Sequence, residues 1–243
     1  MGRLGGLPQF EIQTCESLLA GLPSGTPNAA FAGVTAVTAV TEFTQDECTR
    51  AQSIVSATRR AQFLAGRRLA KRMLSQALGG SPTDWPISAD ATAKPQVVGH
   101  DLQLSIAHSG PFVVCSIANQ PVGIDIEQLT RARPVADMAR LVCSDAEQRA
   151  LQELHGDDAS LLFLQWWTRK EARLKQYGLP FGFAALRAIE TTAADPFDAD
   201  VATWCFQEPR LVVSLAGAGL SGVHTCWPDT WHSNTLEWHR YSS

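Results

Sequence analysis

Two carboxylates stand on alternate residues of a short apolar segment, Val122–Glu127. If this segment is a β-strand, Asp125 and Glu127 point to the same face, about 7 Å apart, because alternate side chains of a strand share a face. Two carboxylates so close repel each other unless a cation lies between them, and a hard cation such as Mg²⁺ prefers oxygen ligands. Gly123 lies on the same face and is expected to leave room for a ligand. The alternative is an exposed strand face that carries acids without binding anything.

A third carboxylate interrupts the apolar face of a predicted helix over residues 159–177. Glu171 follows Trp167 by four residues, so both side chains lie on that face. A carboxylate in an apolar surface is costly unless it is paired or bound to a metal. The simpler alternative is an ion pair with Lys175, four residues further on, and Lys170 is a second local partner.

Polar side chains also end a candidate strand just before this acidic segment. Ser105, His108 and Ser109 lead into a turn at Gly110. A histidine there either contacts a phosphate or caps the turn, and the sequence favours neither. A Ser/His/Asp triad can be composed with Asp125, but the chain has no G-x-S-x-G nucleophile elbow, so the sequence does not favour a serine hydrolase.

Positive charge is concentrated in one segment of a chain whose formal net charge is −4. Residues 48–83 contain no Asp or Glu but carry seven bases, Arg50, Arg59, Arg60, Arg67, Arg68, Lys71 and Arg72. In a predicted helix over residues 59–78, Arg60, Arg67 and Lys71 line the margin of the apolar arc. This pattern predicts a cationic surface for a small anionic ligand or an acidic partner. The alternative is a solvated edge with snorkelling side chains.

Composition excludes several classes of protein. With 45% hydrophobic and 18% charged residues, the 243-residue chain has enough apolar surface to bury a sizeable core. Its longest weakly polar stretch, Ala29–Val40, is shorter than the ~20 residues that a membrane span requires. The negative charge argues against non-specific nucleic-acid binding, and the six cysteines form no CxxC pair. We therefore expect a soluble cytoplasmic protein that binds neither nucleic acid nor membrane.

The order of the predicted elements indicates an α+β fold. Strands are predicted at 34–38, 102–106, 112–118, 122–127, 201–206, 211–215 and 222–227, and helices at 59–78, 144–154 and 159–177. The strands at 112–118 and 122–127 are predicted to form a hairpin. Because helices precede strands in both halves, we expect two related halves, residues 1–120 with the basic helix and residues 121–243 with the acids.

Five short motifs occur in the order FLAGR (63–67), KP (94–95), IAHSG (106–110), VGIDIE (122–127) and WWTRKEARLK (166–175). In this order they resemble the 4′-phosphopantetheinyl transferases of the Sfp type. The resemblance covers about residues 59–178. It implies two similar α/β halves in one chain, related by a pseudo-twofold axis, and a monomer rather than the half-length trimeric form of the family.

The resemblance also implies a role for each motif residue. The acids that match metal ligands of the family are Asp125, Glu127 and Glu171, which would hold Mg²⁺, or Mn²⁺ in its place, with the coenzyme A pyrophosphate. The bases that match its phosphate contacts are Arg60, Arg67, Lys94, His108 and Lys175. Ala107 departs from the family pattern, which has a serine before the histidine. Ser109 or Ser105 is expected to supply the missing hydroxyl contact.

The implied reaction is attack by a serine hydroxyl of an apo acyl or peptidyl carrier protein on the β-phosphorus of coenzyme A, with release of 3′,5′-ADP. Lys175 would assist the leaving group, and either Glu171 or Glu127 would be the base, directly or through a metal-bound water. Three alternatives are a non-catalytic module that binds an acidic protein through the basic helix, another Mg²⁺-dependent phosphate or pyrophosphate enzyme, and a nucleic-acid-binding domain.

Overall fold

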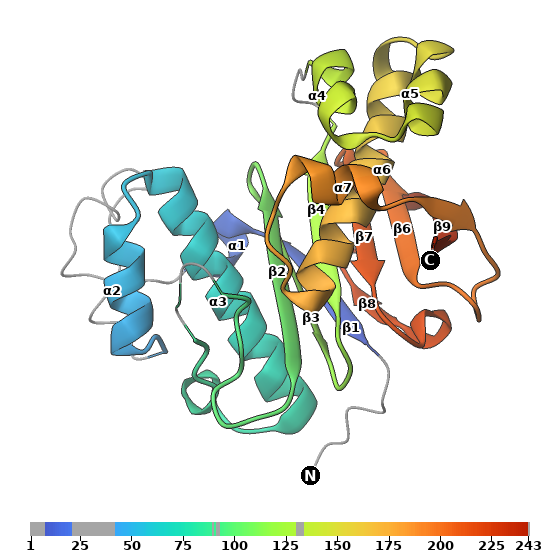
Figure 1. Ribbon diagram of the computed structural model, residues 1–243. Helices are drawn as coiled ribbons and strands as arrows, with labels where there is room; N and C mark the ends of the chain where they lie inside the picture. Colours follow the sequence, from blue (N-terminus) through green and yellow to red (C-terminus); the bar gives the residue numbers. More distant parts are fainter. Residues whose placement is uncertain (1–7, 21–41, 89, 91–92, 130–133, 243) are drawn as a thin grey trace.

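The computed structural model describes residues 8–20, 42–88, 90, 93–129 and 134–242. Its strands form two sheets with helices packed on them, so the predicted α+β class is confirmed (Figure 1). The strand predicted at 34–38 lies outside the described residues. None of the described helices combines the length and the apolar character needed to cross a bilayer.

The first sheet has the strand order β2-β3-β1-β8. Its strands are β1 (Gln9–Thr14), β2 (Gln103–Ser109), β3 (Phe112–Ala118) and β8 (His224–Cys226). Strand β3 pairs antiparallel with β1 and β2, and β8, from the far end of the chain, pairs parallel with β1. The helices of this part are α1 (Cys15–Leu19), α2 (Gln45–Ser53) and α3 (Ala57–Leu78), followed by a 3₁₀ turn at Pro82–Asp84.

The second sheet is antiparallel throughout and has the order β4-β7-β6-β9-β5. Its strands are β4 (Gly123–Gln128), β5 (Thr191–Ala193), β6 (Val201–Phe206), β7 (Leu211–Ala216) and β9 (Ser233–Tyr241). The helices that accompany it are α4 (Val135–Val142), α5 (Asp145–Gln152), α6 (Gly156–Tyr177) and α7 (Phe183–Ala188), and a 3₁₀ turn spans Leu220–Gly222.

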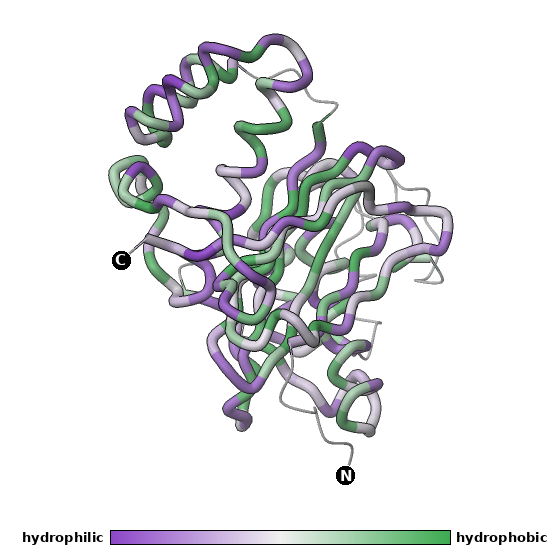
Figure 2. Tube along the Cα trace, turned by 90° about the vertical axis from the view of Figure 1, so that its right-hand side faces the viewer, coloured by the Kyte–Doolittle hydropathy of each residue, from purple (hydrophilic) through white to green (hydrophobic). Residues whose placement is uncertain are grey.

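The hydrophobic core is layered, with one long helix outside each sheet. Strand β3 illustrates this, since Phe112 and Val114 join a cluster shared with the second sheet, whereas Val113 and Cys115 join the cluster under α3. Both faces of the strand are buried, so its residues are apolar apart from Ser116. Hydrophobic colouring along the central strands is visible in Figure 2. Strand β4 therefore lies against helix α6 and beside β2 and β3 of the first sheet.

The two halves repeat one topology. In the first, β1, α3, β2 and β3 follow each other and the strands pair in the order β2-β3-β1. In the second, β4, α6, β6 and β7 follow each other and pair in the order β6-β7-β4. Helices α3 and α6 each have 22 residues. Residue 120, the boundary expected between the halves, lies in the link between β3 and β4. The sheets do not divide strictly at this point, because β8 from the second half pairs with β1 in the first sheet.

The predicted hairpin of 112–118 with 122–127 is wrong. Strand β3 forms its hairpin with β2 through the turn at Gly110, whose φ of +55° favours glycine. Strand β4 instead pairs with β7 in the other sheet. The residues Asn119–Pro121 carry the chain from one sheet to the next, because both edges of β3 are already paired with β1 and β2.

Candidate active site

Strand β4 and helix α6 pack together with almost no space between their backbones. A Cβ atom placed on Gly123 would lie 2.0 Å from the Ala172 carbonyl oxygen and 2.3 Å from the Gln176 amide nitrogen. The glycine therefore makes room for a helix, not for a ligand as the sequence suggested. This close approach brings the residues beside Ala172 and Gln176 next to the acids of β4.

One ammonium group joins acids from both elements. Lys175 Nζ lies 2.5 Å from Asp125 Oδ1 on β4 and 3.3 Å from Glu171 Oε2 on its own helix. The predicted ion pair of Glu171 with Lys175 is thus confirmed, and it extends to the strand. Helix α6 ends immediately afterwards at Gly178 in the left-handed conformation, so Lys175 lies in its last turn.

The acids at this site exceed the positive charge that faces them. Burial raises the pKa of the Asp125 carboxyl to about 8; Lys175 opposes this shift, and Glu171 and Glu127 add to it. Burial alone would lower the pKa of Lys175, but the attraction of Asp125 and Glu171 outweighs it, so this pKa is raised as well. Both groups therefore hold their protons more tightly than they do in water.

Glu127 is directed toward strand β2. Its Oε2 accepts a hydrogen bond from the Ser109 hydroxyl at 2.7 Å, and the Ser109 oxygen accepts the Gln128 amide at 3.1 Å. Ser105 likewise accepts the Ile124 amide at 3.0 Å. The two serines of β2 thus satisfy amides of β4 where no strand ladder does, and Ser109 also orients a carboxylate.

The three predicted metal acids are not gathered into one cluster. Among the described residues, no group of three His, Cys, Asp or Glu side chains is close enough to hold a metal ion. Lys175 is paired with two of the acids, and Glu127 is bonded to Ser109. The arrangement still fits a divalent cation at Asp125, because its Oδ2 is buried and accepts no hydrogen bond from any described residue.

His108 is an exposed residue of β2 near this cluster. Partial desolvation and the positive charge of Lys175 lower the pKa of its imidazole, Arg59 contributes in the same direction, and Glu127 opposes them. The imidazole ring therefore lies close enough to Lys175, Glu127 and Arg59 for their charges to act on it. Arg59, which lies in the first turn of α3, was not among the predicted site residues. Its proximity to β2 depends on the packing of α3, which sequence spacing does not reveal.

Lys94 clamps the end of helix α6 to the beginning of β4. Its ammonium donates to the carbonyl oxygens of Val122 at 2.9 Å and Gln176 at 3.0 Å. Desolvation by burial lowers its pKa to about 8. Lys94, which was predicted to bind a phosphate, thus makes contacts that hold β4 and α6 together.

Part of the predicted cationic surface of α3 is interior. Lys71 is fully buried, and Arg67, 6% exposed, has its guanidinium carbon 5.0 Å from the centre of the Phe63 ring. Desolvation by burial lowers the pKa of Arg67, and its Nη1 has no hydrogen-bond partner among the described residues. Arg60 is half-buried and contacts the Val55 carbonyl oxygen at 3.5 Å. The bases of this helix therefore differ in environment, which the margin of a helical wheel does not predict.

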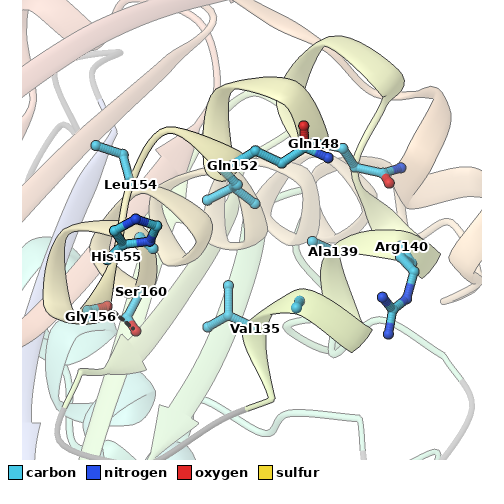
Figure 3. Close-up of a pocket in the computed structure, with 12 residues that line it drawn as sticks. Val135, Ala139, Arg140, Gln148, Gln152, Leu154, His155, Gly156 and Ser160 are labelled. Carbon is cyan, nitrogen blue, oxygen red and sulfur yellow. Dashed lines mark hydrogen bonds between the residues drawn. The ribbon is translucent and has the colours of Figure 1, made fainter.

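A cavity of about 640 Å³ lies between α4, α5 and the beginning of α6 (Figure 3). Its walls include Val135, Ala139 and Leu151, with His155 and Ser160 at the helix start. None of the predicted site residues lines it. We therefore do not assign it to the chemistry of β4 and α6.

Comparison with known proteins gives matches to a single family. Residues 121–212 match the sequence profile of the 4′-phosphopantetheinyl transferase superfamily. This segment contains β4, α6 and the carboxylates and lysine described above.

Individual relatives extend the similarity to most of the chain. The chain is 28% identical to 4′-phosphopantetheinyl transferase HetI of Nostoc over 200 residues, which cover 77% of this chain and 81% of HetI. It is 31% identical to a 4′-phosphopantetheinyl transferase of Bacillus subtilis over 116 residues, and 30% identical to the Sfp transferase of that organism over 117. Each of these two alignments covers 47% of this chain and 51% of the relative, so the chain spans about half the length of the Bacillus proteins it matches.

Proposed function

We propose that the chain is a 4′-phosphopantetheinyl transferase, which transfers the phosphopantetheine arm of coenzyme A to a serine of an apo acyl or peptidyl carrier protein; the match of residues 121–212 to that superfamily and the similarity of most of the chain to HetI support this. In this reaction the serine oxygen forms a bond to the β-phosphorus, and the bond from that phosphorus to the bridging oxygen breaks. The bridging oxygen leaves with 3′,5′-ADP, and the serine proton is taken up by a base.

The observation that carries this proposal is the convergence of Asp125 and Glu171 on Lys175. It joins Asp125 of a strand to Glu171 of a helix, 46 positions apart in the chain, and one buried oxygen of Asp125 has no hydrogen-bond partner among the described residues. Acids in excess of cations, with a lysine among them, suit a site that must bind both a divalent cation and a phosphate.

Asp125, Glu171 and Glu127 would hold Mg²⁺, or Mn²⁺ in its place. Bound there, the ion would neutralise the pyrophosphate and stabilise the charge that develops on the leaving oxygen. The unpartnered Oδ2 of Asp125 supports this assignment most directly.

The residues of the chain would carry the remaining steps. Glu171 or Glu127 would accept the serine proton. Both carboxylates lie close enough to Asp125 for their charges to act on it, and Glu127 also bonds to Ser109. Lys175 would turn to the phosphates and place positive charge beside the departing oxygen. His108, with Arg59 nearby, would bind a phosphate of coenzyme A, and Arg60, Arg67, Lys94 and Ser109 complete the proposed coenzyme contacts.

We place the coenzyme contacts of residues 1–120 and the metal acids of residues 121–243 in one monomer that acts in the cytoplasm. Ser105 and Ser109, which bridge β2 and β4, support a site built from both halves of one chain.

Mass spectrometry of several apo-carrier proteins tests the proposal. After incubation with the protein, coenzyme A and Mg²⁺, one serine of a carrier should gain the mass of a phosphopantetheine arm, and 3′,5′-ADP should appear in equal amount. Coenzyme A turnover to free phosphates without carrier modification would favour another phosphate enzyme instead. Binding of carriers without any modification would favour a non-catalytic module.

A further inference from the structure

A buried lysine contacts a helix cap in the first half of the chain. Glu47, in the first turn of α2, accepts the amide of the N-cap residue Thr44 on its Oε2 at 2.8 Å. The same Oε2 lies 2.8 Å from Lys71 Nζ of α3, and both side chains are 0% exposed. Lys71 also donates to the Glu42 carbonyl oxygen at 2.7 Å. The lysine therefore completes the cap of α2 and ties α2 to the long helix.

The same arrangement occurs in the second half. Glu147, in the first turn of α5, accepts the amide of the N-cap residue Ser144 on its Oε2 at 2.8 Å. That oxygen lies 2.7 Å from Lys170 Nζ of α6, whose side chain is 2% exposed. Lys170 also donates to the Val142 carbonyl oxygen at 3.0 Å. Lys170 thus pairs with α5, not with Glu171 as the sequence suggested.

The two arrangements agree atom for atom. Lys71 and Lys170 are each the fifteenth residue of a 22-residue helix. In both halves the carbonyl that accepts from the lysine precedes the N-cap residue by two positions. A buried ammonium is stable only when its donors are satisfied, so each lysine fits a single position of its helix against the cap.

This restraint acts directly on the site helix. Successive residues of an α-helix point about 100° apart, so a residue that fixes one direction also fixes its neighbour. Lys170, held against α5, directs Glu171 and, one turn later, Lys175 toward β4. Rotation of α6 about its axis would break the contact of Lys170 and that of Lys175 with Asp125 together.

We propose that Glu147 and Lys170 are positioning residues, which set the rotation of α6 over β4 and thereby bring Glu171 and Lys175 to Asp125. The inference rests on the proposed function only in naming those residues as site residues. Glu47 and Lys71 are the equivalent pair for α3, which supplies none of the three acids.

A metal-free measurement tests this inference with a matched control. The chain contains only four lysines, Lys71, Lys94, Lys170 and Lys175, so amine acetylation can be followed at each one by peptide mass spectrometry. The double variant Glu147→Gln/Lys170→Met removes both charges of the second pair. The control Glu47→Gln/Lys71→Met removes the same charges in the first half.

We expect acetylation of Lys175 to become at least about threefold faster in the Glu147→Gln/Lys170→Met variant, because its ammonium leaves the contacts with Asp125 and Glu171 and becomes accessible to the reagent. In the control its rate should stay within about twofold of the unmodified protein. Slow acetylation of Lys71 in the first variant shows that the first half remains folded. Equal acceleration of Lys175 in both variants, or in neither, would overturn the inference.

Two further measurements keep the outcome decisive. If either double variant fails to fold, the single variants Glu147→Gln and Glu47→Gln carry the same comparison, because glutamine keeps the size and the acceptor of the cap. Mn²⁺ affinity, measured on the same proteins, should fall only with the second-half variant. The acetylation result does not depend on transferase activity, so a failure of the proposed function leaves it interpretable.

Discussion

Lys175 contacts an acid of strand β4 and an acid of helix α6. Its ammonium neutralises Asp125 and Glu171 in the protein alone, and the same group is proposed to serve the phosphates when the substrate is present. A divalent cation held by the same two acids would compete with it, because like charges repel.

Replacement of this lysine therefore has opposite effects on stability and on metal binding. In metal-free buffer, Lys175→Met should lower the free energy of unfolding by about 1–3 kcal/mol, since it leaves a buried carboxylate without its partner. Mg²⁺ should then stabilise the variant more than the unmodified protein, as measured by urea unfolding with and without the ion. Lys175→Arg, which keeps the charge, is the control. Equal stabilisation of all three proteins by Mg²⁺ would show that the lysine and the ion do not compete.

Sequence patterns located these residues and the local pair of Glu171 with Lys175, but not the partners that come from other elements. The period of two placed Asp125 and Glu127 on one face, and helical spacing marked Glu171 as anomalous. The link from Asp125 to Lys175 spans 50 positions, and no local pattern encodes such a contact. Similarly, Ser109 looked like a ligand contact but bonds to Glu127, because the position of β2 beside β4 is a property of the fold.

At the scale of secondary structure, the contact of β4 with α6 depends on one missing side chain. The helix and the strand were both predicted, and Gly123 was expected to leave open space. The sequence did not reveal that the backbone of the helix fills this space. A glycine in a strand marks the close approach of either a ligand or another backbone, and sequence does not distinguish these cases.

Gly123→Ala should therefore displace α6. The added methyl group would meet backbone atoms, which cannot rotate away, so we expect a loss of about 3 kcal/mol in the free energy of unfolding, as for severe overpacking. Gly182→Ala is a suitable control, because a Cβ there meets no atom within 4 Å and the backbone is extended, with φ of −167°. Its effect should stay within about 0.5 kcal/mol. Similar unfolding curves for the two variants in urea would contradict the close packing described here.

At the scale of the whole molecule, two halves of equal topology combine their sheets into one core. Sequence predicted related halves from the order of helices and strands, although no repeat is visible in the letters. It missed β1, which pairs with β3 about a hundred residues away, and β9, because such pairings join distant segments. It also assigned β4 to the wrong neighbour, since a short link between two strands favours a hairpin in any local scheme.

The C-terminal strand β9 gives the whole fold a sensitivity to acid. Desolvation by burial lowers the pKa of His239 from 6.5 to about 4; Arg169 contributes, and Glu237 opposes the shift. The unfolded chain therefore binds more protons than the folded one between these pH values, so stability is lost as the pH falls from 6.5 toward 4.

His239→Gln should remove this part of the pH dependence. Between pH 7 and pH 5, the unmodified protein should lose more free energy of unfolding than the variant, as measured by urea denaturation at both pH values. Comparison of the two proteins cancels the contributions of all other groups. An identical loss in both would mean that His239 titrates alike in the folded and unfolded states.

Binding of Mn²⁺, followed by electron paramagnetic resonance in the absence of any carrier protein, is the most direct test of the site. We expect one tightly bound ion per chain, a loss of at least about tenfold in affinity for Asp125→Asn and for Glu171→Gln, and no change for Asp157→Asn, an exposed acid in the first turn of the same helix. Retention of full Mn²⁺ affinity in a folded Asp125→Asn variant would contradict the assignment of β4 and α6 as a divalent-metal site.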